Sequence, residues 1–119
     1  MLAQPEPQAI FKVDRLTVGY NTSRATSVAP IAGLSLNIYQ GEITCILGKS
    51  GCGKTTLLKA LGGFVVGDDS GGVLFGGRYV VEPTPEIVMI FQENNLFPWL
   101  TVRGNVRFGL RFKRDPLPD

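Results

Sequence analysis

The sequence contains no histidine, and this absence excludes several kinds of chemistry. No catalytic triad with a histidine base, no histidine metal ligand and no histidine general acid is possible. The only cysteines are Cys45 and Cys52, which are too few for a disulfide-stapled secreted domain. No apolar run approaches the roughly 18 residues that a membrane-spanning helix needs, and the first residues do not form a signal peptide. We therefore expect a soluble chain in a reducing compartment.

The sequence also has little net charge. Its 12 Lys and Arg residues against 10 Asp and Glu residues give +2, which is far from the strongly basic surface that nucleic acid attracts. Glycine, in contrast, is abundant: 15 of the 119 residues are glycine, well above the usual share of about 7%. An excess of this size indicates that the backbone needs glycine at particular positions.

Alternating apolar and polar residues predict an antiparallel β region near the N-terminus. Residues 10–20 and 34–40 both show the period of two that is typical of an amphipathic strand. A tight turn at residues 40–42 then leads into another apolar segment, which is a hairpin signal. Residues 1–9, which contain two prolines, are expected to form a flexible leader before a single domain at 10–119.

Two short, continuously apolar segments predict strands of a different kind. Residues 43–47 and 86–91 resemble strands that are buried on both faces of a parallel sheet. Between them, residues 54–61 have the spacing of a helix, and residues 73–81 predict a hairpin around two glycines. Thr101 is expected to cap a final helix.

The segment GKSGCGKTT at residues 48–56 follows a predicted buried strand and precedes a predicted helix. It fits the pattern G-x-x-x-x-G-K-[ST], in which glycines let backbone N–H groups turn inward around phosphates. Lys54 would then carry a mobile cation to the β and γ phosphates, and the Thr55 hydroxyl would ligate Mg²⁺. The alternative is a glycine-rich surface turn. The predicted nucleotide-binding residues of this loop are Gly48, Ser50, Gly51, Cys52, Gly53, Lys54, Thr55 and Thr56.

Three separated motifs resemble one family, the ATP-binding cassette (ABC) subunits of membrane transporters. GKSGCGKTTLLKALGGF is similar to the family's Walker A region, and MIFQENNLFPWLTVRGNV is similar to its Q-loop region. Tyr20 stands where the family has an A-loop aromatic residue. The resemblance covers residues 10 to about 113 and is closest to importers of the nitrate, sulfonate and taurine group.

The resemblance implies an α/β P-loop NTPase fold, with an antiparallel β subdomain beside the first part of a parallel-sheet core. ATP and Mg²⁺ are the implied cofactors. Tyr20 would stack on the adenine, whereas Gln92 would act with Lys54 in catalysis and with Thr55 at the metal. On local evidence, Tyr20 and Gln92 could equally be ordinary residues at strand ends.

The resemblance also implies partners and a location. The apolar stretch at residues 96–100 would receive transmembrane permease subunits, although core packing explains it as well. A second ATP-binding subunit is a further expected partner, and nucleic acid is not. The row of Arg103, Arg107 and Arg111 is either solvated or faces a partner. The expected location is cytoplasmic, peripheral at the inner face of the cell membrane.

Three elements of the family's ATPase are missing from this sequence: an LSGGQ-like signature, a Walker B strand ending in Asp-Glu, and the switch histidine. We therefore expect the N-terminal portion of a transport-coupled ATPase, marginally stable alone, that binds nucleotide weakly and does not hydrolyse it. A non-catalytic nucleotide-binding or interaction remnant is the alternative. Another P-loop enzyme, a GTPase or a kinase, is a third hypothesis: residues 68–71 spell D-x-x-G, but no N-K-x-D guanine motif accompanies them.

Overall fold

The computed structural model describes residues 8–19, 29–93 and 95–112. The chain divides into two units, residues 1–88 and residues 89–119. Tyr20 and most of the leader that the sequence predicts at residues 1–9 lie outside the described residues.

The first unit is built on an antiparallel sheet. Its strands are ordered β2-β1-β3-β4, and each strand is antiparallel to its neighbours. The antiparallel region predicted near the N-terminus is therefore confirmed, and so is the hairpin predicted at 73–81, where Gly76 and Gly77 turn with φ of +54° and +82°. The strands are β1 (Ala9–Val18), β2 (Ile31–Tyr39), β3 (Gly72–Phe75) and β4 (Arg78–Tyr79).

Strand β1 is irregular around Arg15, which has a positive φ of 43°. The pairing register with β2 shifts there, and the Arg15 N–H donates to the Ser35 hydroxyl at 2.9 Å. A short loop fastens to the same place, because the Asp68 N–H donates to the Thr17 carbonyl at 2.9 Å. The Asp68 carboxylate accepts hydrogen bonds from the hydroxyl and the N–H of Ser70, and these bonds lower the pKa of Asp68 below its usual value. Asp68, the first residue of the D-x-x-G sequence, thus serves a local turn.

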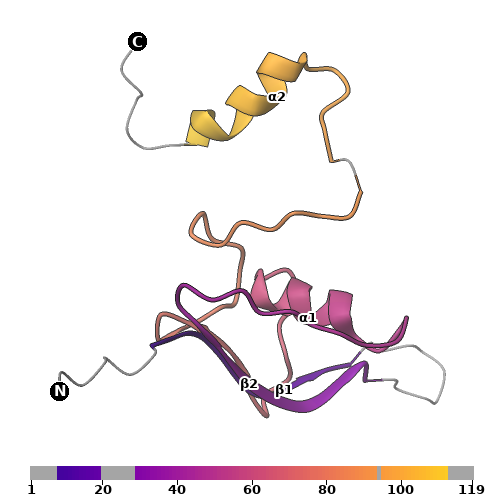
Figure 1. Cartoon of the computed structure of the whole chain (residues 1–119), viewed down its shortest axis with the longest axis vertical. Coiled ribbons are helices and arrows are strands. Elements are labelled where there is room, and N and C mark those ends of the chain that lie inside the picture. The colour runs from indigo at the N-terminus through magenta and orange to yellow at the C-terminus, as the bar shows by residue number, and fades with distance from the viewer. Residues whose placement is uncertain (1–7, 20–28, 94, 113–119) are drawn as a thin grey trace. The chain divides into compact units, whose positions relative to one another are not determined.

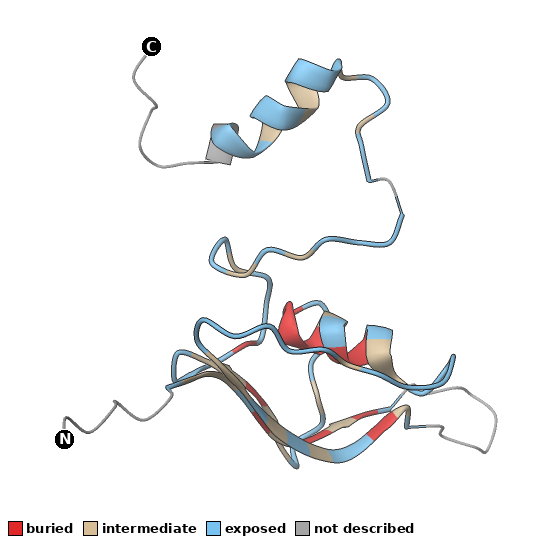
Figure 2. Cartoon of the chain, viewed as in Figure 1, coloured by how far each residue is buried: buried red, intermediate tan, exposed pale blue. Residues whose placement is uncertain are grey.

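One helix covers the sheet. Helix α1 (Lys54–Leu61) has the bounds that the sequence predicts, and it ends at Gly62 followed by Gly63 in a left-handed conformation. In Figure 1, α1 lies on one face of the sheet, and Figure 2 shows the buried residues where the helix and the strands face each other. The buried apolar core consists of Val13, Leu16, Val18, Ile31, Leu57, Ala60, Leu61, Val73 and Val80.

The prediction of two buried parallel strands is wrong. Neither residues 43–47 nor residues 86–91 form a strand, and Ile43, Leu47 and Ile90 have 92% or more of their surface exposed. The turn at 40–42 does form, with the Glu42 N–H donating to the Tyr39 carbonyl at 3.4 Å. The physical reason for the difference is that a doubly buried strand needs a hydrogen-bonded neighbour, and no strand of the described residues lies beside either segment.

The second unit contains helix α2 (Val102–Phe108), which continues into the 3₁₀ helix η1 (Gly109–Phe112). As the sequence predicts, Thr101 caps α2: its hydroxyl accepts from the Gly104 N–H at 3.1 Å. None of the residues of α2 is buried (Figure 2). No helix within the described ranges combines the length and the apolar character that crossing a membrane requires.

Candidate functional site

The glycine-rich loop at residues 48–53 leads directly into α1. Gly51 and Gly53 adopt positive φ values of 80° and 99°, a conformation that glycine reaches without strain. Inside the loop, the Cys52 N–H donates to the Lys49 carbonyl at 3.3 Å, and the first bond of the helix runs from the Leu57 N–H to the Gly53 carbonyl at 2.9 Å. The loop and the helix thus form one continuous hydrogen-bonded element.

Two glycines of the loop have close neighbours where a side chain would begin, a backbone oxygen at Gly53 and a side-chain sulfur at Gly48. A Cβ atom on Gly53 would lie 2.5 Å from the Pro30 carbonyl oxygen and 3.4 Å from the Ile31 side chain. A Cβ atom on Gly48 would lie 2.5 Å from the Cys52 sulfur. The loop is therefore packed tightly against the start of β2 on one side and against itself on the other.

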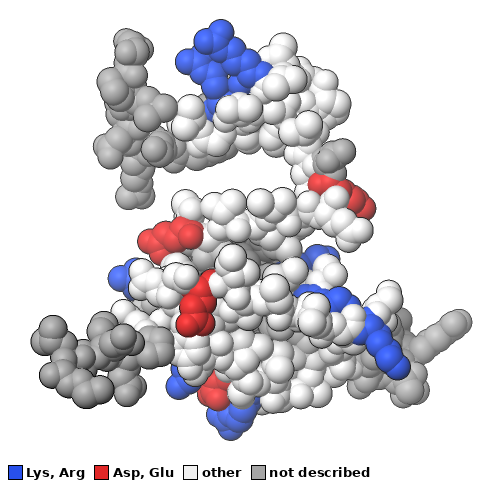
Figure 3. Space-filling model, viewed as in Figure 1, with Lys and Arg blue, Asp and Glu red and all other residues white. Residues whose placement is uncertain are grey.

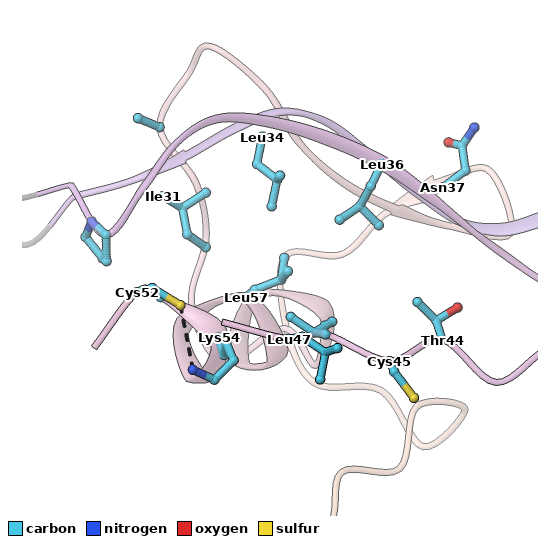
Figure 4. A pocket seen from close by; sticks show the side chains of 14 residues that line it. Ile31, Leu34, Leu36, Asn37, Thr44, Cys45, Leu47, Cys52, Lys54 and Leu57 are labelled. Carbon is cyan, nitrogen blue, oxygen red and sulfur yellow. Dashed lines mark hydrogen bonds between the residues drawn. The ribbon is translucent and has the colours of Figure 1, made fainter. Parts of the chain in front are cut away.

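The Lys54 ammonium folds back over the loop. Its Nζ donates to the carbonyl oxygens of Gly48 and Lys49, both at 2.7 Å, and lies 3.6 Å from the Cys52 Sγ (Figure 4). The flexible Lys54 side chain can exchange these neutral carbonyls for a negatively charged oxygen, because a charge-assisted hydrogen bond is the stronger one. The arrangement places a positive charge where the loop curves.

The N-terminus of α1 adds to this positive potential. The first N–H groups of a helix have no intrahelical partner, and the helix dipole places partial positive charge there. The first turn of α1 carries no acidic residue, and the Gly53 cap contributes no side-chain hydrogen bond that would compete for these groups. Thr55 is exposed on this turn, whereas Thr56 is buried to 8% relative exposure and can offer only a small part of its surface.

An apolar cavity of about 520 Å³ adjoins the loop. It lies between β2, which contributes Ile31, Leu34 and Leu36, and the segment that carries Leu47 (Figure 4). Cys52, Gly53 and Lys54 line one side of this cavity, so the glycine loop forms part of its wall. The rest of the lining is mainly apolar, and the surface that suits phosphate oxygens is therefore the part that the loop contributes.

The two remaining predicted site residues do not belong to the described part of the first unit. Gln92 is exposed and belongs to the second unit, and Tyr20 lies outside the described residues. Within the described ranges, no group of three or more cysteines or carboxylates could hold a metal ion. Mg²⁺ binds few protein oxygens and takes its other ligands from water and phosphate. The Thr55 hydroxyl is therefore a suitable protein ligand for a Mg²⁺ ion that is bound to a nucleotide.

Sequence reasoning missed one residue of the second unit. The Asn105 side chain forms hydrogen bonds to the backbone of Phe97, Leu100 and Thr101, and so fastens the turn that precedes α2. The signal in the sequence is an asparagine within a helical segment, which is an unfavourable helix residue unless its side chain has local partners.

A glycine loop that joins an apolar segment to a helix, with Lys54 and Thr55 at its end, defines a P-loop protein. The match to a family model then narrows the class. The model described as "ABC transporter" matches residues 31–116, and the chain belongs to the ABC transporter family.

Similar proteins agree with this assignment. The chain is 44% identical, over 91% of its length, to a taurine import ATP-binding protein from Chromobacterium violaceum, and it spans 40% of that protein. It is 39% identical, over 82% of its length, to a nitrate import ATP-binding protein from Synechococcus elongatus, and spans 35% of it. A solved dimeric ATP-binding cassette in a post-hydrolysis state, bound to ADP and Pi, has a TM-score of 0.79 at 27% identity, covering 91% of this chain and 50% of the other. The chain thus spans half or less of each of these proteins.

Proposed function

We propose that this chain is the N-terminal portion of the ATP-binding subunit of an ABC importer, and that its glycine loop binds the phosphates of ATP. The observation that carries the proposal is the position of the Lys54 ammonium, 2.7 Å from two loop carbonyls at the N-terminus of α1. The taurine and nitrate import relatives support the direction of transport. In the complete subunit, ATP binding and hydrolysis would be coupled to solute uptake.

Each loop residue has a physical role in this proposal. The backbone N–H groups of residues 48–53 and the first turn of α1 would surround the phosphate oxygens. Lys54 would leave the Gly48 and Lys49 carbonyls to neutralise the β and γ phosphates. Ser50 and Cys52 would line the nest, and Thr56 would contact the α phosphate with the little surface that it exposes.

Mg²⁺ would be held by the Thr55 hydroxyl together with phosphate oxygens and by the Gln92 side-chain oxygen. The metal supplies charge neutralisation at the transferred phosphoryl group. Gln92 would also orient the attacking water in the complete ATPase, and Tyr20 would stack on the adenine ring.

The proposed partners are the transmembrane permease subunits and a second ATP-binding subunit. The permease would contact the apolar region after Gln92, where Leu96 and Trp99 have 68% and 73% of their surface exposed. Large exposed apolar side chains of this kind are typical of a protein contact. Because the proposed partner is a membrane protein, we propose that the chain lies in the cytoplasm at the inner face of the cell membrane.

Replacing Lys54 with alanine tests the proposed site. We expect a fluorescent ATP analogue to bind 10-fold to 100-fold more weakly, because a hydrogen bond to a charged group contributes about 1.5–3 kcal/mol. Lys59→Ala, which removes the same charge at the other end of α1, is the control and should leave the dissociation constant within about twofold. Equal affinities of the wild type and Lys54→Ala would contradict the phosphate-binding role.

Hydrolysis and base preference are measured separately. We expect binding without turnover from the 119-residue chain, since the sequence lacks the signature, Walker B and histidine elements. Co-purification with the permease would support a transporter subunit, and its absence would favour a non-catalytic remnant.

A preference for the GTP analogue over the ATP analogue would favour the GTPase hypothesis instead.

Alkylating Cys52 is expected to prevent nucleotide binding. Its thiol is exposed inside the loop, and its sulfur lies where a Cβ on Gly48 would already clash, so an added group would fill the phosphate nest. The measurement is binding of the ATP analogue after complete modification of a Cys45→Ser variant, which leaves Cys52 as the single thiol. Cys52→Ser treated with the same reagent should bind normally. Unchanged binding by the modified protein would show that the loop tolerates the group.

A further inference from the structure

The pairing of β1 with β2 contains two bulges that are built in the same way. In the first, which we call the Gly33 bulge, Ala32 and Gly33 of β2 lie opposite the single residue Thr17 of β1. Gly33 has a positive φ of 64°, and its N–H donates to the Thr17 hydroxyl oxygen at 3.0 Å. The second bulge, at Arg15 of β1, exchanges the strands: the Arg15 N–H donates to the Ser35 hydroxyl at 2.9 Å. In each bulge a hydroxyl across the ladder satisfies the N–H of the irregular residue.

The Gly33 bulge changes the face of the sheet toward which the start of β2 points. Side chains alternate along a regular strand, so Ile31 and Leu34, three positions apart, would face opposite sides. The extra residue brings them to the same side, where both line one cavity with Leu57 of α1 (Figure 4). Ile31 is buried, whereas Ala32 and Gly33 are exposed. Without the bulge, Ile31 would face away from the helix.

The part of β2 that the bulge orients is the part that contacts the glycine loop. The Pro30 carbonyl oxygen lies 2.5 Å, and the Ile31 side chain 3.4 Å, from the position that a Cβ on Gly53 would take. Gly53 directly precedes Lys54, the cation of the loop. The start of β2 therefore supports the loop at the residue where α1 begins.

We propose that Thr17 is a positioning residue for the phosphate loop. Its hydroxyl holds the Gly33 N–H, and the bulge turns Ile31 toward α1. The start of β2 then keeps Gly53 in the conformation that directs Lys54 and the first N–H groups of α1 at the phosphates. This inference rests on the phosphate-binding function proposed above. It adds a residue of β1 that acts on the loop through Gly33 and Ile31.

Replacing the Thr17 hydroxyl tests the positioning role. Thr17→Val removes the accepting oxygen and keeps the β-branched shape of the side chain. We expect the ATP analogue to bind about fivefold more weakly, the factor that corresponds to one neutral hydrogen bond. Thr17→Ser keeps the oxygen and should restore the dissociation constant to within about twofold of the wild type.

The second bulge supplies the matched control. Ser35→Ala removes the same kind of hydrogen bond, from the Arg15 N–H, but Ser35 lies farther along β2 from Pro30 than Gly33 does. We expect Ser35→Ala and Thr17→Val both to lower the urea midpoint, and Ser35→Ala alone to keep the wild-type dissociation constant within about twofold.

The Ser70 hydroxyl requires a control of its own, because it lies 3.5 Å from the Thr17 hydroxyl oxygen. Ser70→Ala removes this contact and leaves the bond to the Gly33 N–H, so the affinity for the analogue should stay within about twofold. All of these substitutions exchange one uncharged residue for another. The Lys, Arg, Asp and Glu side chains that Figure 3 displays therefore stay the same, and a changed attraction for phosphate does not explain the results.

A second pair of variants strains the bulge without changing the Thr17 hydroxyl. A Cβ on Gly33 would point into open space, so Gly33→Ala adds only the cost of a positive φ. The bulge relieves this cost by moving, and Pro30 moves with it, so we expect at least threefold weaker binding. Gly41, in the turn after β2, has φ of 80° and equally open surroundings. Gly41→Ala should keep the affinity within about twofold.

The backbone amide signals of residues 51–54 report the position of the loop when no nucleotide is present. We expect these signals to shift in the NMR spectrum of Thr17→Val and to stay in place in that of Ser35→Ala. Wild-type affinity in Thr17→Val, or an equal loss of affinity in Ser35→Ala, would overturn the positioning role. If the wild type and Lys54→Ala bind the analogue equally, the phosphate-binding function fails instead. The amide signals then still decide whether Thr17 positions the loop.

Discussion

Replacing Gly53 with alanine is expected to reduce nucleotide binding below detection, a larger effect than any other single change in the loop. Gly53 has φ of +99°, which costs an L-residue roughly 1–2 kcal/mol. The added Cβ would also lie 2.5 Å from the Pro30 carbonyl oxygen, which belongs to the backbone and cannot rotate away. The loop would have to move off the start of β2, and Lys54, the next residue, would move with it.

Gly51→Ala is the matched control for this prediction. Gly51 also has a positive φ, of 80°, but its Cβ would point into open space. It should therefore show the conformational cost alone, about 10-fold weaker binding of the ATP analogue. Thermal melts of both variants should be recorded, so that a local change in the loop is distinguished from unfolding. Equal affinities of Gly51→Ala and Gly53→Ala would mean that the contact with Pro30 is unimportant.

The parts of the structure that depend on local sequence could be predicted. Helix α1 has its predicted bounds because Gly62 and Gly63 end it and Lys54 follows a glycine loop of known pattern. The Thr101 cap and the turn at Gly76 and Gly77 are equally local. In each case the relevant atoms lie within a few residues of one another, so spacing and residue type are sufficient.

The parts that depend on distant neighbours could not be predicted. Ile43 and Ile90 lie in apolar runs whose composition suits buried strands, yet composition does not supply the strand that must pair with them. Asn105 is different again. Its four hydrogen bonds reach back as far as Phe97, eight residues earlier, and no period or motif encodes that contact.

Replacing Leu16 with alanine is expected to have the largest effect on stability. Leu16 is 0% exposed and belongs to the core between β1 and α1. Truncating a fully buried leucine leaves a cavity and typically costs about 2–5 kcal/mol, a large part of the total stability of a small unit. Urea unfolding followed by circular dichroism should show a lower midpoint with a similar slope, or no cooperative transition where the loss exceeds the stability that is present.

Ile43→Ala is the control for Leu16→Ala. It tests whether Ile43 is exposed, as in the structure, or buried in a strand, as the composition of residues 43–47 predicts. The apolar run of residues 43–47 suggests a buried strand, in which losing Ile43 would cost as much as losing Leu16. With Ile43 93% exposed, we expect its truncation to change the free energy of unfolding by less than about 0.5 kcal/mol. If Ile43→Ala lowers the urea midpoint as far as Leu16→Ala does, Ile43 is buried in solution. In that event the segment at 43–47 has a partner strand, and the glycine loop that follows it is anchored to a sheet.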